Sequence, residues 1–382
     1  MARYRTAVVA LTLSCCCVPV VQAARPATTA QEEAVAQPAG NANTLLPKTA
    51  WRIPLRKTPA LGRGTIQQGQ PVVVGDTVYV GSATAAVVAI TTAGKPLWTY
   101  RTQGPVVAPV TLSNNIVFAP DTKGFVYAIH QTDGTEEWRV ELGSELATRP
   151  LAVQQRLFVV TARGELVAIH AKTGNVEWRT TERLTAAPFL VKGGSDPLLA
   201  GGLIVAGFAD GHVAAYDPQH GNIVWDHQVS PRNAVLHDVD MTPLLIGDQL
   251  LVASVGGGLS ALHARTGRPL WRSPIASPND LLLHGDYLYV SGGGKVYGLN
   301  LRNGSRQWLT DLPESEVSAP VLVNGHLVVV STHNTLYLLD PQQGTLLASR
   351  PMGTGTYGRL TTDGNQLFIL TNNNHLAALR FP

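Results

Sequence analysis

The sequence predicts an all-β fold, an eight-bladed β-propeller of four-stranded antiparallel blades, from three features of its repeats. A tryptophan recurs at intervals of 37 to 47 residues, a spacing typical of propeller blades. A glycine stands four residues before every tryptophan except the first. A proline opens most repeats, as is tolerated at the first residue of a strand. The tryptophans are Trp51, Trp98, Trp138, Trp178, Trp225, Trp271 and Trp308, and Ala348 takes this place in the next repeat.

Six of the eight repeats begin with a small or polar residue and a proline, which open the first of four short strands. In the other two repeats we expect Asp280 and Arg359 to take the proline position and to face the central channel. The fourth repeat is longer, with its excess at residues 192–202, which predicts an extended mobile hairpin. The six openings with proline are Gln70-Pro71, Ala108-Pro109, Arg149-Pro150, Ala187-Pro188, Thr242-Pro243 and Ala319-Pro320.

The two ends of the repeat region complete each other. The last repeat opens at Arg359 and ends without an outer strand, whereas residues 49–53, which contain Trp51, form an outer strand with no blade before it. Pairing of the N-terminal strand with the C-terminal blade therefore closes the ring and leaves every blade with two neighbours.

A structural role is expected for the tryptophans. A large ring on the outer strand fills the space between neighbouring blades, and its N–H reaches a backbone carbonyl. The glycine permits a tight turn and the close approach of a ring to the backbone. The alternative, an aromatic ladder that binds a ligand, requires exposed rings on one surface.

The chain divides into three parts. Residues 1–23 have the basic start, short apolar run and small residues of an export signal. Cleavage after Ala23 gives a soluble periplasmic protein, whereas a stretch that resembles a lipobox makes Cys15 or Cys16 a candidate for lipidation. Residues 24–48 lack aromatics and are expected to form a disordered tether, and residues 49–382 form the propeller.

Composition excludes several classes of function. All three cysteines lie in the leader, so the mature protein has no disulfide and no cysteine-bound zinc. A net charge of +3 gives no argument for nucleic acid. The histidines at the equivalent positions His130, His170 and His263 are expected to lie far apart and to cap turns. No catalytic, metal or cofactor site is predicted.

The repeat Ala-x-His/Asp-x-x-x-Gly-x-x-x-Trp, as at Ala168, His170, Gly174 and Trp178, resembles that of quinoprotein-type (PQQ-like) propellers. The segment at residues 238–243 and the blade that follows are similar to the BamB family of outer-membrane assembly factors. This resemblance implies a lipid-anchored, non-enzymatic scaffold on the periplasmic face of the outer membrane, monomeric within a complex with BamA. It places Asp238, Asp240 and Arg183 in the BamA contact surface.

Other interpretations remain open at the sequence level. The two carboxylates can instead satisfy backbone N–H groups or, with His237, form a metal or acid–base site. For partner contact they must be exposed. A periplasmic ligand-binding or quinone-dependent propeller and a platform for another envelope complex are the alternative functions. The quinoprotein resemblance implies a vicinal disulfide for the enzymes of that class, which this cysteine-free propeller cannot form.

We predict that Trp178→Ala lowers the free energy of unfolding by about 3–5 kcal/mol, as is typical when a large buried side chain is truncated. Thermal unfolding followed by circular dichroism measures the change. An unaltered melting temperature would contradict a packing role for the tryptophan.

Overall fold

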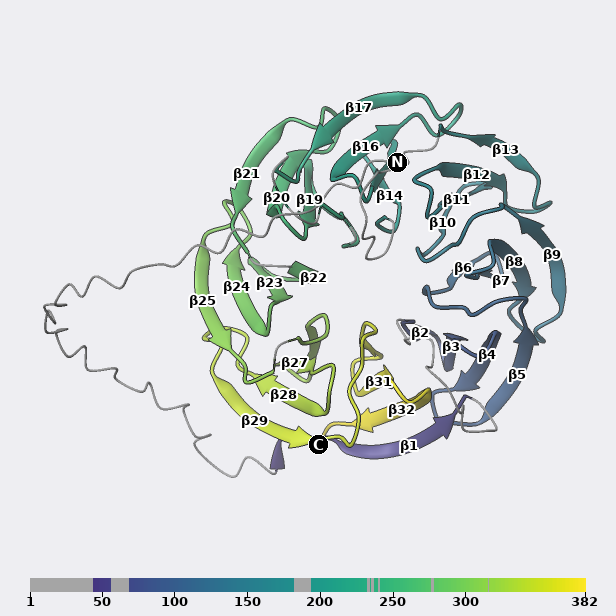
Figure 1. The fold of residues 1–382 in the computed structure, drawn as a ribbon. Coiled ribbons are helices and arrows are strands. Elements are labelled where there is room, and N and C mark those ends of the chain that lie inside the picture. The colour runs from purple at the N-terminus through teal and green to yellow at the C-terminus, as the bar shows by residue number, and fades with distance from the viewer. Residues whose placement is uncertain are drawn as a thin grey trace, which may run out of the picture. The chain divides into compact units, whose positions relative to one another are not determined.

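A computed structural model describes residues 44–55, 69–181, 194–231, 234, 237–239, 241–275, 278–314 and 316–382. The described residues form eight four-stranded antiparallel sheets, whose strands follow one another from the innermost to the outermost. The sheets stand around a central axis as the blades of a propeller (Figure 1). The predicted fold class and number of blades are therefore confirmed.

The strands are short and have regular lengths from blade to blade. The strands of the first four blades are β2 (Val72–Val74), β3 (Thr77–Ser82), β4 (Ala86–Thr91), β5 (Pro96–Arg101); β6 (Thr111–Ser113), β7 (Ile116–Pro120), β8 (Phe125–His130), β9 (Glu136–Glu141); β10 (Leu151–Val153), β11 (Arg156–Val160), β12 (Leu166–His170), β13 (Val176–Arg179); β14 (Leu198–Ala200), β15 (Leu203–Gly207), β16 (His212–Tyr216) and β17 (Ile223–Gln228). The strands of the last four are β18 (Leu244–Ile246), β19 (Gln249–Ser254), β20 (Gly258–His263), β21 (Pro269–Ser273); β22 (Pro278–His284), β23 (Tyr287–Gly292), β24 (Lys295–Asn300), β25 (Arg306–Asp311); β26 (Val321–Val323), β27 (His326–Val330), β28 (Thr335–Leu339), β29 (Leu346–Pro351); β30 (Thr361–Thr362), β31 (Gln366–Leu370), β32 (His375–Arg380) and β1 (Lys48–Pro54).

The ring closes through the two ends of the described chain. Strand β1 pairs with β32 as the outer strand of blade eight, and Trp51 lies opposite Ala378. The expected pairing of the termini is thus confirmed. Leu45 and Leu46, which precede this strand, pack against the hydrophobic cluster between blades seven and eight. The folded part therefore begins before the expected boundary at residue 49.

The middle strands of each blade are buried, and the outer strand faces solvent. In β12 the first four residues are buried, whereas exposed and half-buried residues alternate along β9. Buried side chains of adjacent blades form the clusters between them, one of which joins Phe118 of blade two to Val159 of blade three. The core is thus a ring of interfaces between blades, consistent with strands that are apolar on both faces.

Each tryptophan packs on the glycine of the following blade. A Cβ added to Gly174 would lie 2.8 Å from the ring of Trp138, and its φ of +75° already favours glycine. The Trp138 indole also donates a hydrogen bond to the carbonyl of Ala171, at 3.1 Å, in the same turn of blade three. The same two contacts recur for Trp51, Trp98, Trp225 and Trp308. The predicted wedge and its carbonyl partner are thus found in most blades.

The alanine of the repeat makes room for the ring. Trp178 lies opposite Ala168, beside a β-bulge, and Trp308 lies opposite Gly298, where an added Cβ would stand 2.3 Å from the indole. In blade seven the large and the small residue exchange places: Ala348 stands at the tryptophan position, and Leu338 lies opposite it. Leu338 and the C-terminal Phe381 belong to the buried cluster around Ala348, so other apolar side chains occupy the site of the missing indole.

Blade four corrects the sequence-based alignment. Its innermost strand β14 follows Pro197, and 28 residues separate this proline from Trp225, as in the other blades. The opening is therefore not at Pro188, and residues 194–202 are not an extended hairpin. Ser195 instead donates its N–H to the carbonyl of Gly207, at 3.0 Å. The extra residues belong to the connection that precedes this blade. Its residues 182–193 lie outside the described residues.

We predict that Gly174→Ala lowers the free energy of unfolding by about 3 kcal/mol, because left-handed strain and overpacking against Trp138 add. Gly202→Ala is the matched control. Its φ is +86°, with no atom within 4 Å of an added Cβ, so strain alone predicts about 1 kcal/mol. Chemical denaturation measures both. Equal losses would show that the ring contact contributes nothing.

Candidate functional site

A ring of equivalent positions surrounds the central channel, one from each blade, just before the innermost strand. Strand register places Gln70, Pro109, Arg149, Asp196, Thr242, Asp280, Ala319 and Arg359 at these positions, which we call the channel ring. Asp280 and Arg359 therefore belong to the channel, as expected. They correspond, however, to the residue before the proline, and Leu281 and Leu360 take the proline position itself.

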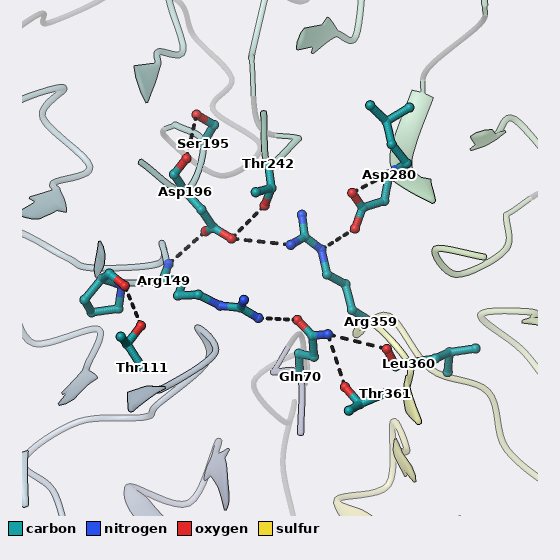
Figure 2. A network of polar contacts seen from close by, with 12 residues as sticks. Gln70, Thr111, Arg149, Ser195, Asp196, Thr242, Asp280, Arg359, Leu360 and Thr361 are labelled. Atoms are coloured by element: carbon teal, nitrogen blue, oxygen red, sulfur yellow. Dashed lines mark hydrogen bonds and ion pairs between the residues drawn. The ribbon is translucent and has the colours of Figure 1, made fainter. Parts of the chain in front are cut away.

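Arg359 connects blades across the channel. Its Nε donates to a carboxylate oxygen of Asp280 in blade six, and its Nη1 lies 3.4 Å from Oδ2 of Asp196 in blade four. Blades four and eight stand on opposite sides of an eight-membered ring, so this guanidinium reaches over the axis (Figure 2). Both acidic residues are buried: Asp196 is 2% exposed and Asp280 is 8% exposed. Only direct pairing makes such burial tolerable.

Asp196 has further partners on either side. Its Oδ1 accepts the backbone N–H of Arg149 at 2.8 Å, and its Oδ2 accepts the hydroxyl of Thr242 at 2.7 Å. Asp196 thereby joins blades three, four and five, in addition to blade eight. Three contacts to one carboxylate, from Arg149, Thr242 and Arg359, fix its position strongly.

Arg149 and Gln70 extend the network to the remaining side of the channel. Nη2 of Arg149 donates to Oε1 of Gln70 at 2.5 Å, and the Gln70 amide donates to the hydroxyl of Thr361 at 3.1 Å. Burial lowers the pKa of the Arg149 guanidinium, the charge of Asp196 raises it, and Arg359 lowers it further. The ring carries two cations and two anions, so its charge is balanced. This arrangement ties the blades together at the axis.

The segment that contains Asp238 connects blade four to blade five on one face of the propeller. Val239 donates its N–H to the carbonyl of Phe208 in blade four, at 3.2 Å, and the carbonyl of Asp238 accepts the N–H of Val255 in blade five, at 3.1 Å. His237 lies 3.0 Å from the hydroxyl of Ser230. The segment is therefore held by both blades.

Asp238 is buried. Only 1% of the residue is accessible, and Val239 is fully buried beside it. Asp238 is therefore not the exposed carboxylate that a direct partner contact requires, and the segment is held in place because Val239 belongs to the hydrophobic cluster between blades four and five. The burial of Asp238 favours the structural interpretation. Asp240, Arg183, Cys15 and Cys16, the other predicted contact and lipidation residues, lie outside the described residues.

The equivalent histidines also depart from expectation. His130 and His170 line one cleft between blades two and three instead of lying far apart. Each still helps to form its turn, since the carbonyls of His130 and His170 accept the N–H groups of Gly134 and Gly174. Among the described residues, no group of three His, Cys, Asp or Glu side chains is arranged to hold a metal ion.

Sequence reasoning missed most of the channel ring. The sequence marks Arg149 and Thr242 only as residues that precede a proline, and Asp196 lies in the segment predicted to form a hairpin. Their signal in the sequence is a polar residue that recurs at this position in several blades. The predicted opening of blade four hides this signal, because it places Ala187 at the position that Asp196 occupies.

Fold and repeat together define the class of this protein: an all-β propeller with eight blades built from PQQ-like repeats. The family model described as outer membrane protein assembly factor BamB matches residues 47–141, 109–310 and 292–381. The chain therefore belongs to the BamB family. No described helix has the length and apolar character required to cross a membrane.

Curated relatives and solved structures agree with this assignment. Outer membrane protein assembly factor BamB of Salmonella typhimurium is 28% identical over 336 residues, which are 82% of this chain and 84% of the relative. The Escherichia coli protein of the same name is 28% identical over 334 residues, with the same coverage. The crystal structure of BamB from Moraxella catarrhalis superposes with a TM-score of 0.76 at 22% identity, covering 88% of this chain and 100% of that chain.

A quinoprotein shares the fold at lower similarity. The structure of a europium-containing methanol dehydrogenase gives a TM-score of 0.68 at 16% identity, over 85% of this chain and 84% of that chain. Such a likeness shows the propeller architecture alone, because one fold carries many functions.

We predict that Arg359→Met lowers the free energy of unfolding by about 3 kcal/mol, because it leaves Asp196 and Asp280 buried without their shared cation. Chemical denaturation measures the loss. Arg302→Met, at an exposed turn, is the control and should change stability by less than about 0.5 kcal/mol. If the two variants lose equally little, the channel network does not hold the blades together.

Proposed function

We propose that this protein is a non-enzymatic scaffold of the outer-membrane β-barrel assembly machinery and binds the periplasmic domains of a BamA-type protein. Membership of the BamB family is the observation that carries the proposal, since the family model matches almost the whole propeller. The matched relatives are named as assembly factors. Attachment to the outer membrane through Cys15 or Cys16 completes the proposal, with residues 24–43 as the tether, because the packed Leu45 and Leu46 already belong to the propeller.

The connection between blades four and five is the proposed contact surface. Its backbone is fixed to both blades by the hydrogen bonds of Asp238 and Val239, so its side chains meet a partner without a large ordering cost. Asp238 then acts from within, as a buried residue that positions the segment. Asp240 and Arg183 are the residues proposed to meet charged groups of the partner, where exposed charges mainly give specificity and association rate.

We predict that Asp240→Ala reduces recovery of BamA when the tagged protein is captured from detergent-solubilised envelopes, while the melting temperature is unchanged. Loss of one charge pair at the edge of an interface lowers affinity by about two- to fivefold. Quantitative immunoblotting of BamA measures the recovery. Asp286→Ala, in an exposed turn on the opposite face, is the matched control and should retain BamA.

Asp238→Asn separates the two roles of this segment. The substitution removes a buried charge, so we expect a lower melting temperature together with weaker capture. Recovery of an unrelated envelope complex in place of BamA, from the unmodified protein, would overturn the proposed function.

A further inference from the structure

Two connections between blades meet at the end of strand β15. The last described residues of the connection from blade three lie there, since Gly194 forms a β-bridge with Phe208 and the hydroxyl of Ser195 accepts the N–H of Gly207 at 2.8 Å. The connection to blade five returns to the same place, because the N–H of Val239 donates to the carbonyl of Phe208 at 3.2 Å. The end of β15 therefore holds both connections next to each other.

A second link joins the same two connections at the axis. The hydroxyl of Thr242, at the end of the connection to blade five, donates to a carboxylate oxygen of Asp196 at 2.7 Å. Arg359 holds this carboxylate from across the channel, at 3.4 Å. In the connection from blade one to blade two, Pro109 takes the place of Thr242 and has no hydroxyl to donate. The link at the axis is therefore missing from that connection.

The residues on either side of Asp240 in the sequence are both buried. Val239 is fully buried in the hydrophobic cluster between blades four and five. Met241 is 1% exposed and belongs to the cluster between blades five and six. The backbone before and after Asp240 is thus fixed, and a residue held in this way loses little freedom when it meets a partner.

Gly207 allows Val239 to lie against β15. A Cβ added to Gly207 would clash with Cγ1 of Val239 and stand 2.8 Å from its Cβ. Blade one has the same contact at the same strand position, because a Cβ added to Gly81 would clash with Cγ1 of Val106 and stand 2.8 Å from its Cβ. Val106 is also fully buried, and its N–H donates to the carbonyl of Ser82 at 3.0 Å. Gly81 is thus a matched counterpart outside the proposed contact surface.

We propose that Gly207 and the hydrogen bond between Thr242 and Asp196 position the connection to blade five for its partner. Gly207 sets the start of the connection and Thr242 sets its end, so that the carboxylate of Asp240 between them meets a basic group. The inference rests on the proposed function, from which the BamA-type partner is taken. The end of β15 and the channel ring thereby take part in recognition as well as in stability.

The first experiment compares Gly207→Ala with Gly81→Ala in the tagged full-length protein. Each substitution displaces a buried valine of one connection, so we expect similar reductions in melting temperature. Only Gly207→Ala moves the residues next to Asp240, so recovery of BamA from solubilised envelopes should fall by about two- to fivefold, as for Asp240→Ala. Gly81→Ala should recover as much BamA as the unmodified protein. Equal recovery by the two glycine variants would overturn the proposal.

A double variant tests whether Gly207 acts through Asp240. If the glycine positions that carboxylate, the two substitutions remove one and the same interaction, so their effects do not add. Gly207→Ala combined with Asp240→Ala should therefore recover as much BamA as Asp240→Ala alone. A loss equal to the product of the two single losses would contradict the positioning role.

Thr242→Val tests the link at the axis, because it exchanges a hydroxyl for a methyl group of similar size. We expect lower recovery of BamA and faster amide hydrogen exchange at Val239. Thr242→Ser keeps the hydroxyl and should restore both. Thr361→Val is the matched control and should change neither, since the hydroxyl of Thr361 donates to the carbonyl of Pro71, at 2.5 Å, between blades eight and one.

The two measurements separate the inference from the function on which it rests. Failure of the unmodified protein to recover BamA would overturn the proposed function. Hydrogen exchange at Val239 does not require a partner. Exchange that is unchanged in Thr242→Val would therefore overturn the positioning role, whether or not BamA is recovered.

Discussion

Contact between an indole and a glycine backbone is the interaction on which the propeller depends. A blade buries its two flat faces only against its neighbours, so each interface between blades must be filled without a gap. A tryptophan from the outer strand enters that space, and its ring meets a turn whose glycine has no Cβ to obstruct it. The opposing Ala168, at the centre of blade three, leaves room on the other side. The tryptophan, glycine and alanine of the repeat are thus three parts of one packing requirement.

Closure of the ring imposes a different solution at the seam. The outer strand of blade eight is β1, which does not follow β32 in the sequence, so no turn joins the two strands on which an indole from blade seven could pack. The pair of Ala348 and Leu338 replaces the usual tryptophan and alanine, and Phe381 fills the cluster from the C-terminal end. The repeat is broken at Ala348 where the covalent chain is broken. The replacement at Ala348 therefore follows from the same packing requirement as the tryptophans elsewhere. The interface between blades seven and eight must also be filled, although the turn that usually helps to fill it is missing.

Sequence reasoning reached the fold because periodic residues report it directly. The number of blades followed from the tryptophans, and the pairing of β1 with β32 followed from the two incomplete ends of the repeat. The candidate site was harder, since its residues share a place in the ring and not a sequence motif. Asp196 and Arg359 are 163 positions apart and meet only because the ring closes. The sequence also does not reveal that Asp238 is buried. A carboxylate in a connection between blades has the same sequence context whether it faces solvent or the interior.

Charged residues of the channel ring occupy an axis that apolar residues could also fill, and the shortness of the innermost strands explains why. At this point the innermost strands, apart from β22, are only two or three residues long, so few backbone hydrogen bonds fix their starts. Asp196, with partners in blades three, five and eight, fixes several of these starts at once. An apolar side chain has no directional contacts with which to do so. Charge balance within the ring, with Arg149 and Arg359 against Asp196 and Asp280, permits this arrangement without leaving an uncompensated charge in the interior. The axis therefore sets the positions of the blades relative to one another.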